Sequence, residues 1–221
     1  NAKKSPYLVK DALVVLPGAE LTVMPGTVIW FLKLGLVVKG QLQIIGTEAE
    51  PVRFASLGAS NWKGVFLDQS HNENKIQHAQ ISNAEFGLRA ADSTVSLQYC
   101  IFQNNVWALV MDEGAAEIPK SVIRTSGKTG IAARKAQLSI KDSVITENSS
   151  GGFILENSKV LIKQNNILNN GNWAVKVIDK AGKVQAAHNW WWDDNPELAE
   201  IIGKLAIQPV LKKPIEFKIV E

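Results

Sequence analysis

The chain of 221 residues contains one cysteine, three histidines and no long run of apolar residues. A single cysteine excludes a disulfide bond within the chain, so cysteine usage gives no evidence for an oxidising compartment. The longest apolar stretch, from Val28 to Val38, is interrupted by Lys33, whereas a membrane span needs roughly 18 uninterrupted apolar residues. The net charge is only +3 and the lysines are scattered, which argues against nucleic-acid binding.

What the sequence does contain is a repeat with a period of 21 or 22 residues. Six apolar residues mark its successive starts: Ile76, Leu97, Ile118, Ile140, Ile162 and Val184. A mostly small residue follows each start three positions later: Ala79, Cys100, Ser121, Ser143, Asn165 and Ala187. A mostly apolar column follows two positions after that: Ile81, Phe102, Ile123, Ile145, Ile167 and Asn189. A fixed period of this length predicts stacked coils, and the alternation at period two predicts that each coil consists of short strands.

Other segments predict the turns and ends of this solenoid. Asn105, Asn148 and Asn170 are expected at sharp corners, because Asn tolerates the left-handed conformation. The polar segment Asp68 to Lys75 is expected to be a flexible excursion. Glycines and prolines in the first 60 residues separate strands of a different rhythm: Leu13 to Val15, Leu21 to Val23, Val28 to Phe31, Leu36 to Val38, Leu42 to Ile45 and Val52 to Ala55.

At the C-terminal end, Asn195 and Pro196 predict the start of a short helix that includes Ile201 and Ile202. The tail from Pro214 to Val220 alternates as a strand. We expect one all-β domain over residues 1–221, with N-terminal coils and a cap in 1–60, regular coils in 61–192 and a C-terminal cap in 193–221. A leucine-rich repeat has an overlapping period, but the coils lack its leucine-bearing helix.

Three parts of the sequence resemble a known group of proteins. They are Leu16 to Ile29 (LPGAELTVMPGTVI), Gly46 to Gly64 with its Pro51-Val52-Arg53-Phe54 and Asn61-Trp62-Lys63-Gly64, and Asn189-Trp190-Trp191-Trp192 with the later Gln208-Pro209-Val210-Leu211. These segments are similar to the extracytoplasmic bacterial right-handed parallel β-helix proteins of the pectin-lyase-like superfamily in its broad sense. The family usually has Gly after its Trp pair, whereas this chain has Asp193-Asp194. The resemblance implies a right-handed β-helix and a periplasmic, surface or secreted location, but this superfamily includes lyases, hydrolases, sugar-binding modules and passive spacers.

Charged residues give only weak catalytic candidates. The polygalacturonase motifs Asn-Thr-Asp, Gly-His-Gly and Arg-Ile-Lys do not occur. An acidic column is formed by Asp92, Asp112, Glu113, Glu156 and Asp179, with Arg134 and Lys135 on the intervening coil. Of these, the candidates for catalysis are Asp92, Glu113, Arg134 and Glu156. Asp92 and Glu113 are close enough in the repeat to share a calcium ion, but Arg134 and Lys135 are expected to neutralise the column. No metal site or cofactor is predicted, and His71, His78 and His188 are expected at the surface or in turns.

Aromatic residues are the stronger candidates for binding. Trp107 and Trp173 occupy the same repeat position as Phe86, and Trp190 belongs to a cluster near the C-terminus. Exposed aromatic faces stack on the apolar faces of sugar rings, so these four residues are the predicted ligand-binding set. Packing under the coil corner or over the terminal core is the alternative interpretation.

Three hypotheses for function follow. The leading one is a non-catalytic, extracytoplasmic module that binds polysaccharide or another envelope component, or acts as a scaffold. The second is a divergent polysaccharide lyase or glycoside hydrolase. The third is a structural segment of a larger surface protein, or a subunit that docks through its coil ends.

Overall fold

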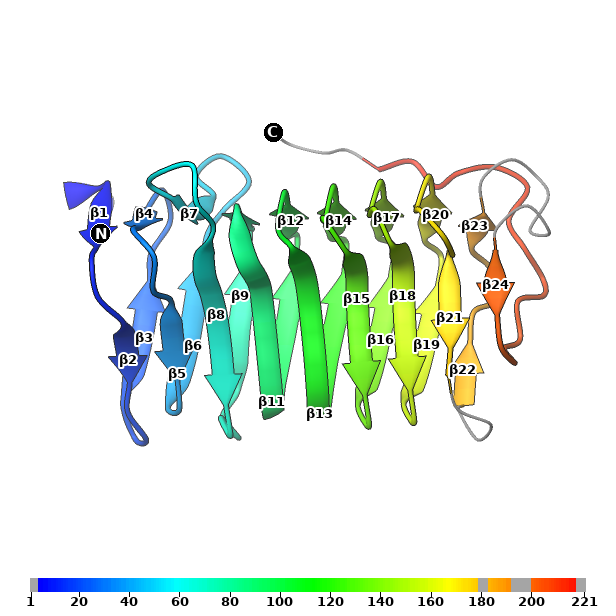
Figure 1. Cartoon of the computed structure of the whole chain (residues 1–221), viewed down its shortest axis with the longest axis horizontal. Helices are drawn as coiled ribbons and strands as arrows, with labels where there is room; N and C mark the ends of the chain where they lie inside the picture. Colours follow the sequence, from blue (N-terminus) through cyan, green and yellow to red (C-terminus); the bar gives the residue numbers. More distant parts are fainter. Residues whose placement is uncertain (1–3, 179–182, 192–199, 218–221) are drawn as a thin grey trace.

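The computed structural model describes residues 4–178, 183–191 and 200–217, and within these ranges its regular structure consists of parallel β-strands without an α-helix. The chain winds into about eight three-sided coils that stack along one axis (Figure 1). Except at the two ends of the stack, each strand pairs with the equivalent strands of the coils before and after it, so the faces of the coils become long parallel sheets. The predicted all-β parallel β-helix is confirmed.

The three faces are called PB1, PB2 and PB3 below. PB1 consists of β2 (Leu13–Val15), β5 (Leu36–Val38), β8 (Trp62–Asp68), the first halves of β11 (Ala84–Gln98) and β13 (Trp107–Pro119), β15 (Thr129–Arg134), β18 (Gly151–Glu156), β21 (Val175–Val177) and β24 (Ile201–Ile202). PB2 consists of β3 (Glu20–Val23), β6 (Gln41–Ile45), β9 (Asn74–Gln77), the second halves of β11 and β13, β16 (Gln137–Lys141), β19 (Lys159–Lys163) and β22 (Lys183–Gln185). PB3 consists of β1 (Tyr7–Val9), β4 (Val28–Phe31), β7 (Val52–Ser56), β10 (Ala79–Ser82), β12 (Ile101–Gln103), β14 (Val122–Arg124), β17 (Val144–Thr146), β20 (Asn166–Leu168) and β23 (Trp190–Trp191).

Each regular corner contains a residue with positive φ, and at Glu113 the following Gly114 has a positive φ as well. A left-handed residue reverses the pleat and turns the chain through a corner within one position, although it costs energy for residues other than Gly. Between PB1 and PB2 these residues are Gln69, Asp92, Glu113, Lys135 and Asn157. Between PB2 and PB3 they are His78, Tyr99, Lys120, Asp142, Gln164 and His188. Between PB3 and PB1 they are Asn83, Asn104, Thr125, Glu147 and Asn169.

The predicted left-handed role of Asn105, Asn148 and Asn170 is therefore wrong by one position. The left-handed residue precedes each of them, and their own side chains point inward, where they form a ladder between coils. The Asn148 Oδ1 atom accepts a hydrogen bond from the backbone N–H of Ser126 at 3.1 Å, and Asn170 Oδ1 accepts one from the N–H of Asn148 at 3.2 Å. The Asn amide suits this position because it satisfies buried backbone groups on neighbouring coils.

A second ladder runs through the predicted small column at the corner between PB2 and PB3. The backbone N–H of Cys100 donates to Ser121 Oγ at 3.1 Å, that of Ser121 to Ser143 Oγ at 3.1 Å, and that of Ser143 to Asn165 Oδ1 at 2.9 Å. The ladder ends where the N–H of Asn165 donates to Asn189 Oδ1 at 3.0 Å. The column is small because the inward side chain must stay close to the backbone of the next coil.

The core is filled by inward columns of aliphatic side chains, with aromatic residues at both ends. Among the first coils, the rings of Phe31 and Trp62 stack at 4.1 Å, and Phe54 packs edge-on against both. In the last coil Trp191 is 1 % exposed and takes the position that Ile167 holds in the preceding coil.

The repeat changes at the last coil, which corrects the predicted alignment there. Val175 pairs with Phe153 at the usual 22-residue spacing, but Val184 pairs with Val160, 24 residues away. Two additional residues therefore lie between β21 and β22. As a result, Asn189 rather than Ala187 continues the small column, and Trp191 rather than Asn189 continues the apolar one.

The six strands predicted in the first 60 residues are present, and they stack as coils on the rest of the chain. Three other expectations about segments need correction. The Asp68 to Lys75 segment is a shorter excursion than predicted, because Asn74 and Lys75 belong to β9 and Ser70 is buried and hydrogen-bonded to Asn74, so the exposed part is confined to residues 69 and 71–73. Ile201–Ile202 forms strand β24 instead of a helix, while residues 192–199, including Asn195 and Pro196, lie outside the described residues. Pro214 to Phe217 forms no strand, and residues 218–220 also lie outside the described part.

Candidate functional site

The predicted aromatic column is a real column on PB1. Phe86 and Trp107 are paired in register on β11 and β13, where PB1 begins after the corner from PB3. The same column continues through Thr129 and Gly151, which are paired in register, and reaches Trp173 one coil later. Since coils are about 4.8 Å apart, Trp107 and Trp173 are separated by roughly 14 Å along the axis.

Each aromatic ring of the column has a cation over it. The three pairs are Arg89 over Phe86 at 5.6 Å, Lys128 over Trp107 at 5.1 Å and Lys176 over Trp173 at 4.8 Å, measured to the ring centroid. Such distances are within the range of cation–π attraction. Within the described residues, none of these three cations forms an ion pair with a carboxylate.

Trp173 is held in place by a glycine of the preceding coil. A Cβ atom on Gly151 would lie 2.2 Å from Trp173 Nε1, so the indole rests directly on the Gly151 backbone. The Nε1 atom is buried and has no hydrogen-bond partner. The Trp173 side chain therefore packs on the coil with one face and has Lys176 over the other. Both interpretations of the sequence apply to it, packing at the coil corner and presentation of an aromatic face.

The other predicted aromatic residue lies elsewhere. Trp190 is on β23 of PB3, paired with Asn166, and so belongs to a different face from Trp107 and Trp173. Its neighbour Trp191 points inward and is buried, and Trp192 lies outside the described residues. The structure therefore brings together three of the four predicted binding residues.

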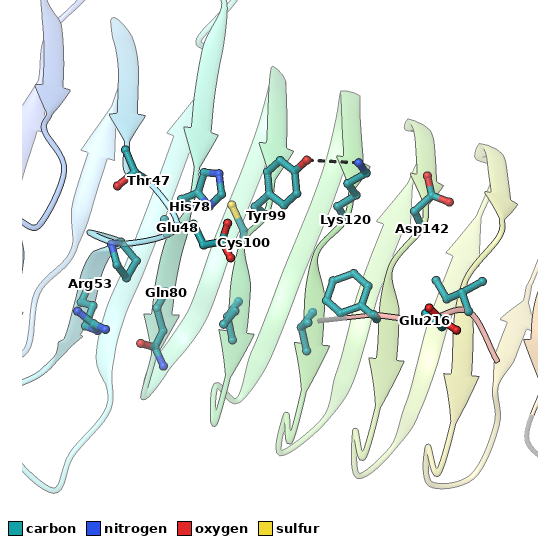
Figure 2. Close-up of a pocket in the computed structure, with 16 residues that line it drawn as sticks. Thr47, Glu48, Arg53, His78, Gln80, Tyr99, Cys100, Lys120, Asp142 and Glu216 are labelled. Atoms are coloured by element: carbon teal, nitrogen blue, oxygen red, sulfur yellow. Dashed lines mark hydrogen bonds between the residues drawn. The ribbon is translucent and has the colours of Figure 1, made fainter. Parts of the chain in front are cut away.

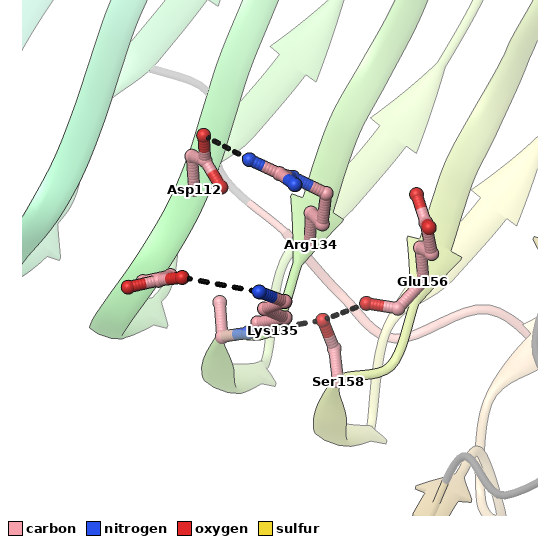
Figure 3. Close-up of polar contacts among 7 residues, drawn as sticks. Asp112, Arg134, Lys135, Glu156 and Ser158 are labelled. Carbon is pink, nitrogen blue, oxygen red and sulfur yellow. Dashed lines mark hydrogen bonds and ion pairs between the residues drawn. The ribbon is translucent and has the colours of Figure 1, made fainter.

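The acidic column separates into two neighbouring columns at the corner between PB1 and PB2 (Figure 3). In one column, Arg134 donates to Asp112 Oδ2 at 2.7 Å and is in register with Glu156. The hydrogen bond from Arg134 and the charge of Asp112 raise the pKa of the guanidinium. Both acids therefore lie beside a permanent cation.

In the second column, Lys135 Nζ lies 3.5 Å from Glu113 Oε1, and His71 Nε2 lies 3.8 Å from Asp92 Oδ2. The predicted pairing of the acids with Arg134 and Lys135 is confirmed. Within the described residues, no three His, Cys, Asp or Glu side chains are grouped so that they could hold a metal ion. Asp179 and Asp193-Asp194 lie outside those residues.

A pocket that the sequence interpretation missed lies at the corner between PB2 and PB3 (Figure 2). It has a volume of about 630 Å³ and is called the corner pocket below. Three left-handed corner residues form one wall: the rings of His78 and Tyr99 stack at 4.5 Å, and Lys120 Nζ donates to the Tyr99 hydroxyl at 3.3 Å. The signal available in the sequence was the 21-residue spacing of these three residues.

The electrostatics of the corner pocket are mixed. Partial burial lowers the pKa of His78, and the nearby Glu48 raises it by less, so the imidazole is neutral at neutral pH. Arg53, Asp142 and Glu216 also line the pocket. Tyr99 lies between the His78 ring and Lys120, whose Nζ is 5.5 Å from the Tyr99 centroid, so the Tyr99 ring has neighbours on both sides.

The C-terminal tail forms the remaining wall of the pocket. Its residues Ile215, Glu216 and Phe217 line the cavity, and the tail runs back along the molecule past β20 (Figure 1). The Asn166 side chain holds it by two hydrogen bonds: Nδ2 donates to the Ile215 carbonyl at 3.0 Å, and Oδ1 accepts from the Ile215 N–H at 2.8 Å.

Comparison with known proteins identifies the fold family. The sequence profile described as the right-handed beta helix region matches residues 63–191, more than half of the chain, so the chain belongs to this family. No curated protein and no solved structure matches the chain. None of the described residues forms a helix long and apolar enough to cross a membrane.

Proposed function

We propose that this right-handed β-helix protein is a non-catalytic, extracytoplasmic module that binds an acidic polysaccharide of the cell envelope or its surroundings. The proposed contact surface is the aromatic column of Phe86, Trp107 and Trp173 on PB1, together with the cations that lie over these rings. The resemblance of the terminal segments to exported β-helix proteins supports the location.

The observation that carries the proposal is the pairing of each ring with a cation that forms no ion pair within the described part of the chain. Aromatic rings contribute apolar contact with sugar rings, and the cations Arg89, Lys128 and Lys176 supply partners for carboxylates. A neutral glycan would use only the first of these contacts. The arrangement therefore favours a polymer that carries regular negative charge.

The fold supports binding because the column is rigid. The strands that carry Phe86 and Trp107 are paired with a strand on each side, so the positions of the rings are set before a ligand arrives. Binding to a preorganised surface costs little conformational entropy on the protein side. An extended polymer aligned with the axis would meet the same chemistry at intervals of whole coils.

The test is a titration of intrinsic tryptophan fluorescence with polygalacturonate, with a neutral glucan for comparison. Trp107→Ala and Trp173→Ala are each expected to weaken polygalacturonate binding by roughly threefold to tenfold. Trp30→Ala is the matched control, since Trp30 is 38 % exposed but lies on β4 of PB3. Lys128→Gln is expected to weaken binding of the acidic polymer while leaving any response to the neutral one unchanged.

Two outcomes would contradict the proposal. If neither tryptophan variant differs from Trp30→Ala, the column is not the contact surface. If polygalacturonate is cleaved to unsaturated or new reducing ends, and Asp92→Ala or Glu113→Ala removes this activity, the protein is an enzyme. Glu113 lies beside the cation Lys135, and within the described residues neither acid belongs to a group that could hold a metal ion, which is why the non-catalytic function is preferred.

A docking role is a second candidate because the first coil has open edges. Strands β1, β2 and β3 each pair with one neighbouring strand within the described residues. Large apolar side chains are exposed on this coil, with Leu8 46 %, Val14 46 % and Leu16 62 % exposed. Sedimentation velocity tests this role, since association through this end should be lost in Leu16→Asp and unaffected by Trp107→Ala.

A further inference from the structure

The outer face of PB3 already binds one extended polypeptide, the chain's own tail. Asn166 is only 7 % exposed because both polar ends of its amide are bonded to the main chain of Ile215. Val122 points away from the core and is nevertheless 1 % exposed, and it lines the same pocket as Phe217. The contacts are main-chain hydrogen bonds plus an apolar surface, which are the contacts by which proteins recognise extended peptides.

The residues that hold the tail belong to one outward column in which two carboxamides stand on either side of a run of aliphatic side chains. Gln80, Ile101, Val122, Val144 and Asn166 are paired in register on consecutive strands of PB3. Three aliphatic side chains are thus bracketed by two carboxamides. The described part of the tail is bonded at the Asn166 end, and the Gln80 side chain makes no hydrogen bond within the described residues.

The Gln80 end of the column is the floor of the corner pocket. Arg53, Gln80, Ile101 and Val122 all line it, and Arg53 is in register with Gln80. Three coil steps of about 4.8 Å give a length of roughly 14 Å, which an extended peptide covers with about four residues. The pocket is therefore long enough for a short segment that continues along the path of the tail.

The wall of the pocket favours a peptide over a sugar. Stacking on a sugar requires an open aromatic face, but the Tyr99 ring is placed between the His78 ring and Lys120. The wall presents two polar groups instead, the Tyr99 hydroxyl and the Lys120 ammonium. These groups can form hydrogen bonds with the backbone carbonyls and polar side chains of a peptide.

We propose that the corner pocket binds a second extended polypeptide segment of about four residues with apolar side chains at alternate positions. Gln80 holds one peptide unit of this segment as Asn166 holds Ile215, and an apolar side chain of the segment packs on Ile101. This site lies on PB3, apart from the aromatic column on PB1, and it does not depend on the proposed binding of polysaccharide.

The probe is a fluorescein-labelled peptide with the tail sequence Lys212 to Glu221, which has the required alternation. Fluorescence anisotropy of this peptide with the full chain should show saturable binding, since the described tail residues bond to Asn166 and leave the Gln80 side chain without a partner. Gln80→Ala should weaken binding about fivefold, the usual effect of losing a neutral hydrogen bond. Gln137→Ala, an exposed Gln on PB2, is the matched control and should leave the affinity unchanged.

A shortened chain that ends at Lys213 opens the Asn166 end as well. It should bind the peptide more tightly than the full chain, and Asn166→Ala in this shortened chain should remove the gain. Absence of saturable binding to the full chain, or equal affinities for Gln80→Ala and Gln137→Ala, would overturn the proposal. A response to oligogalacturonide that Gln80→Ala lowers, without any binding of the peptide, would assign the pocket to sugar instead.

Discussion

Replacement of Asn148 by Ala tests the idea that the inward asparagines hold neighbouring coils together. The Asn148 side chain is fully buried and makes three hydrogen bonds. It accepts from the Ser126 N–H at 3.1 Å and donates to the Ile123 carbonyl at 3.2 Å and to Asn170 Oδ1 at 2.9 Å. Alanine removes all three contacts and leaves a buried N–H without a partner.

The expected cost is large because one of these groups cannot reach water. An unpaired buried donor costs about 1–3 kcal/mol, and each of the other two lost hydrogen bonds contributes about 1 kcal/mol. We therefore expect Asn148→Ala to lower the free energy of unfolding by about 4 kcal/mol, which is a large part of the 5–15 kcal/mol typical of folded domains. In a chain of this size the melting temperature should fall by about 8–16 °C.

Urea unfolding followed by far-UV circular dichroism measures this difference. The control is Asn172→Ala, because Asn172 is exposed and only its backbone N–H is bonded, to the Ser150 carbonyl. The control should stay within about 0.5 kcal/mol of the unchanged protein. If Asn148→Ala also stays within about 1 kcal/mol, the ladder does not stabilise the stack and the argument from buried backbone groups fails.

Three further predictions concern single positions. Gly64→Ala should prevent stable folding, because φ is +104° and the added Cβ would lie 1.6 Å from the Phe86 carbonyl oxygen. Gly58→Ala is the control and should be neutral, since nothing lies within 4 Å of its added Cβ. Soluble yield and melting temperature check both variants. Burial raises the pKa of Cys100 from 9.0 to about 12, so the native thiol should resist iodoacetamide at pH 8 and react in urea. Because the native chain holds that proton more tightly, this contribution to stability is complete below pH 9 and is lost as the pH rises toward 12; rapid native labelling would contradict the buried position. Trp191→Ala should cost about 3–5 kcal/mol in urea unfolding, and a smaller loss would mean that the last coil is not part of the cooperative core.

The stacking of coils was predictable because it depends on side chains that must be buried. An inward aliphatic column such as Ile123, Ile145 and Ile167 recurs at each coil, and each member is fully buried. The period of the sequence therefore identified the axis, the strands and the inward direction. The same reasoning found the column of Phe86, Trp107 and Trp173, since residues one whole coil apart must be neighbours.

The positions of the corners were not predictable from residue type. Asn is common in left-handed turns, and this general preference pointed to Asn148, but the corner residue is Glu147. The amide of Asn148 has a stronger requirement, namely to pair backbone groups inside the stack. The buried role decides here, because the Asn148 amide makes three hydrogen bonds inside the stack, whereas the exposed Glu147 bears a single strained φ angle.

The outward position of the corner residues also explains why the sequence did not predict the corner pocket. The corner residue faces outward, so packing places little demand on its type, and the series His78, Tyr99, Lys120 and Asp142 shares no chemical class. A search for similar residues at a fixed spacing cannot find such a column. Once the coil length is known, however, every outward column becomes a row of side chains about 4.8 Å apart. Differences in function between proteins with this fold are therefore expected to lie in columns whose residues do not repeat, while the columns that do repeat maintain the stack.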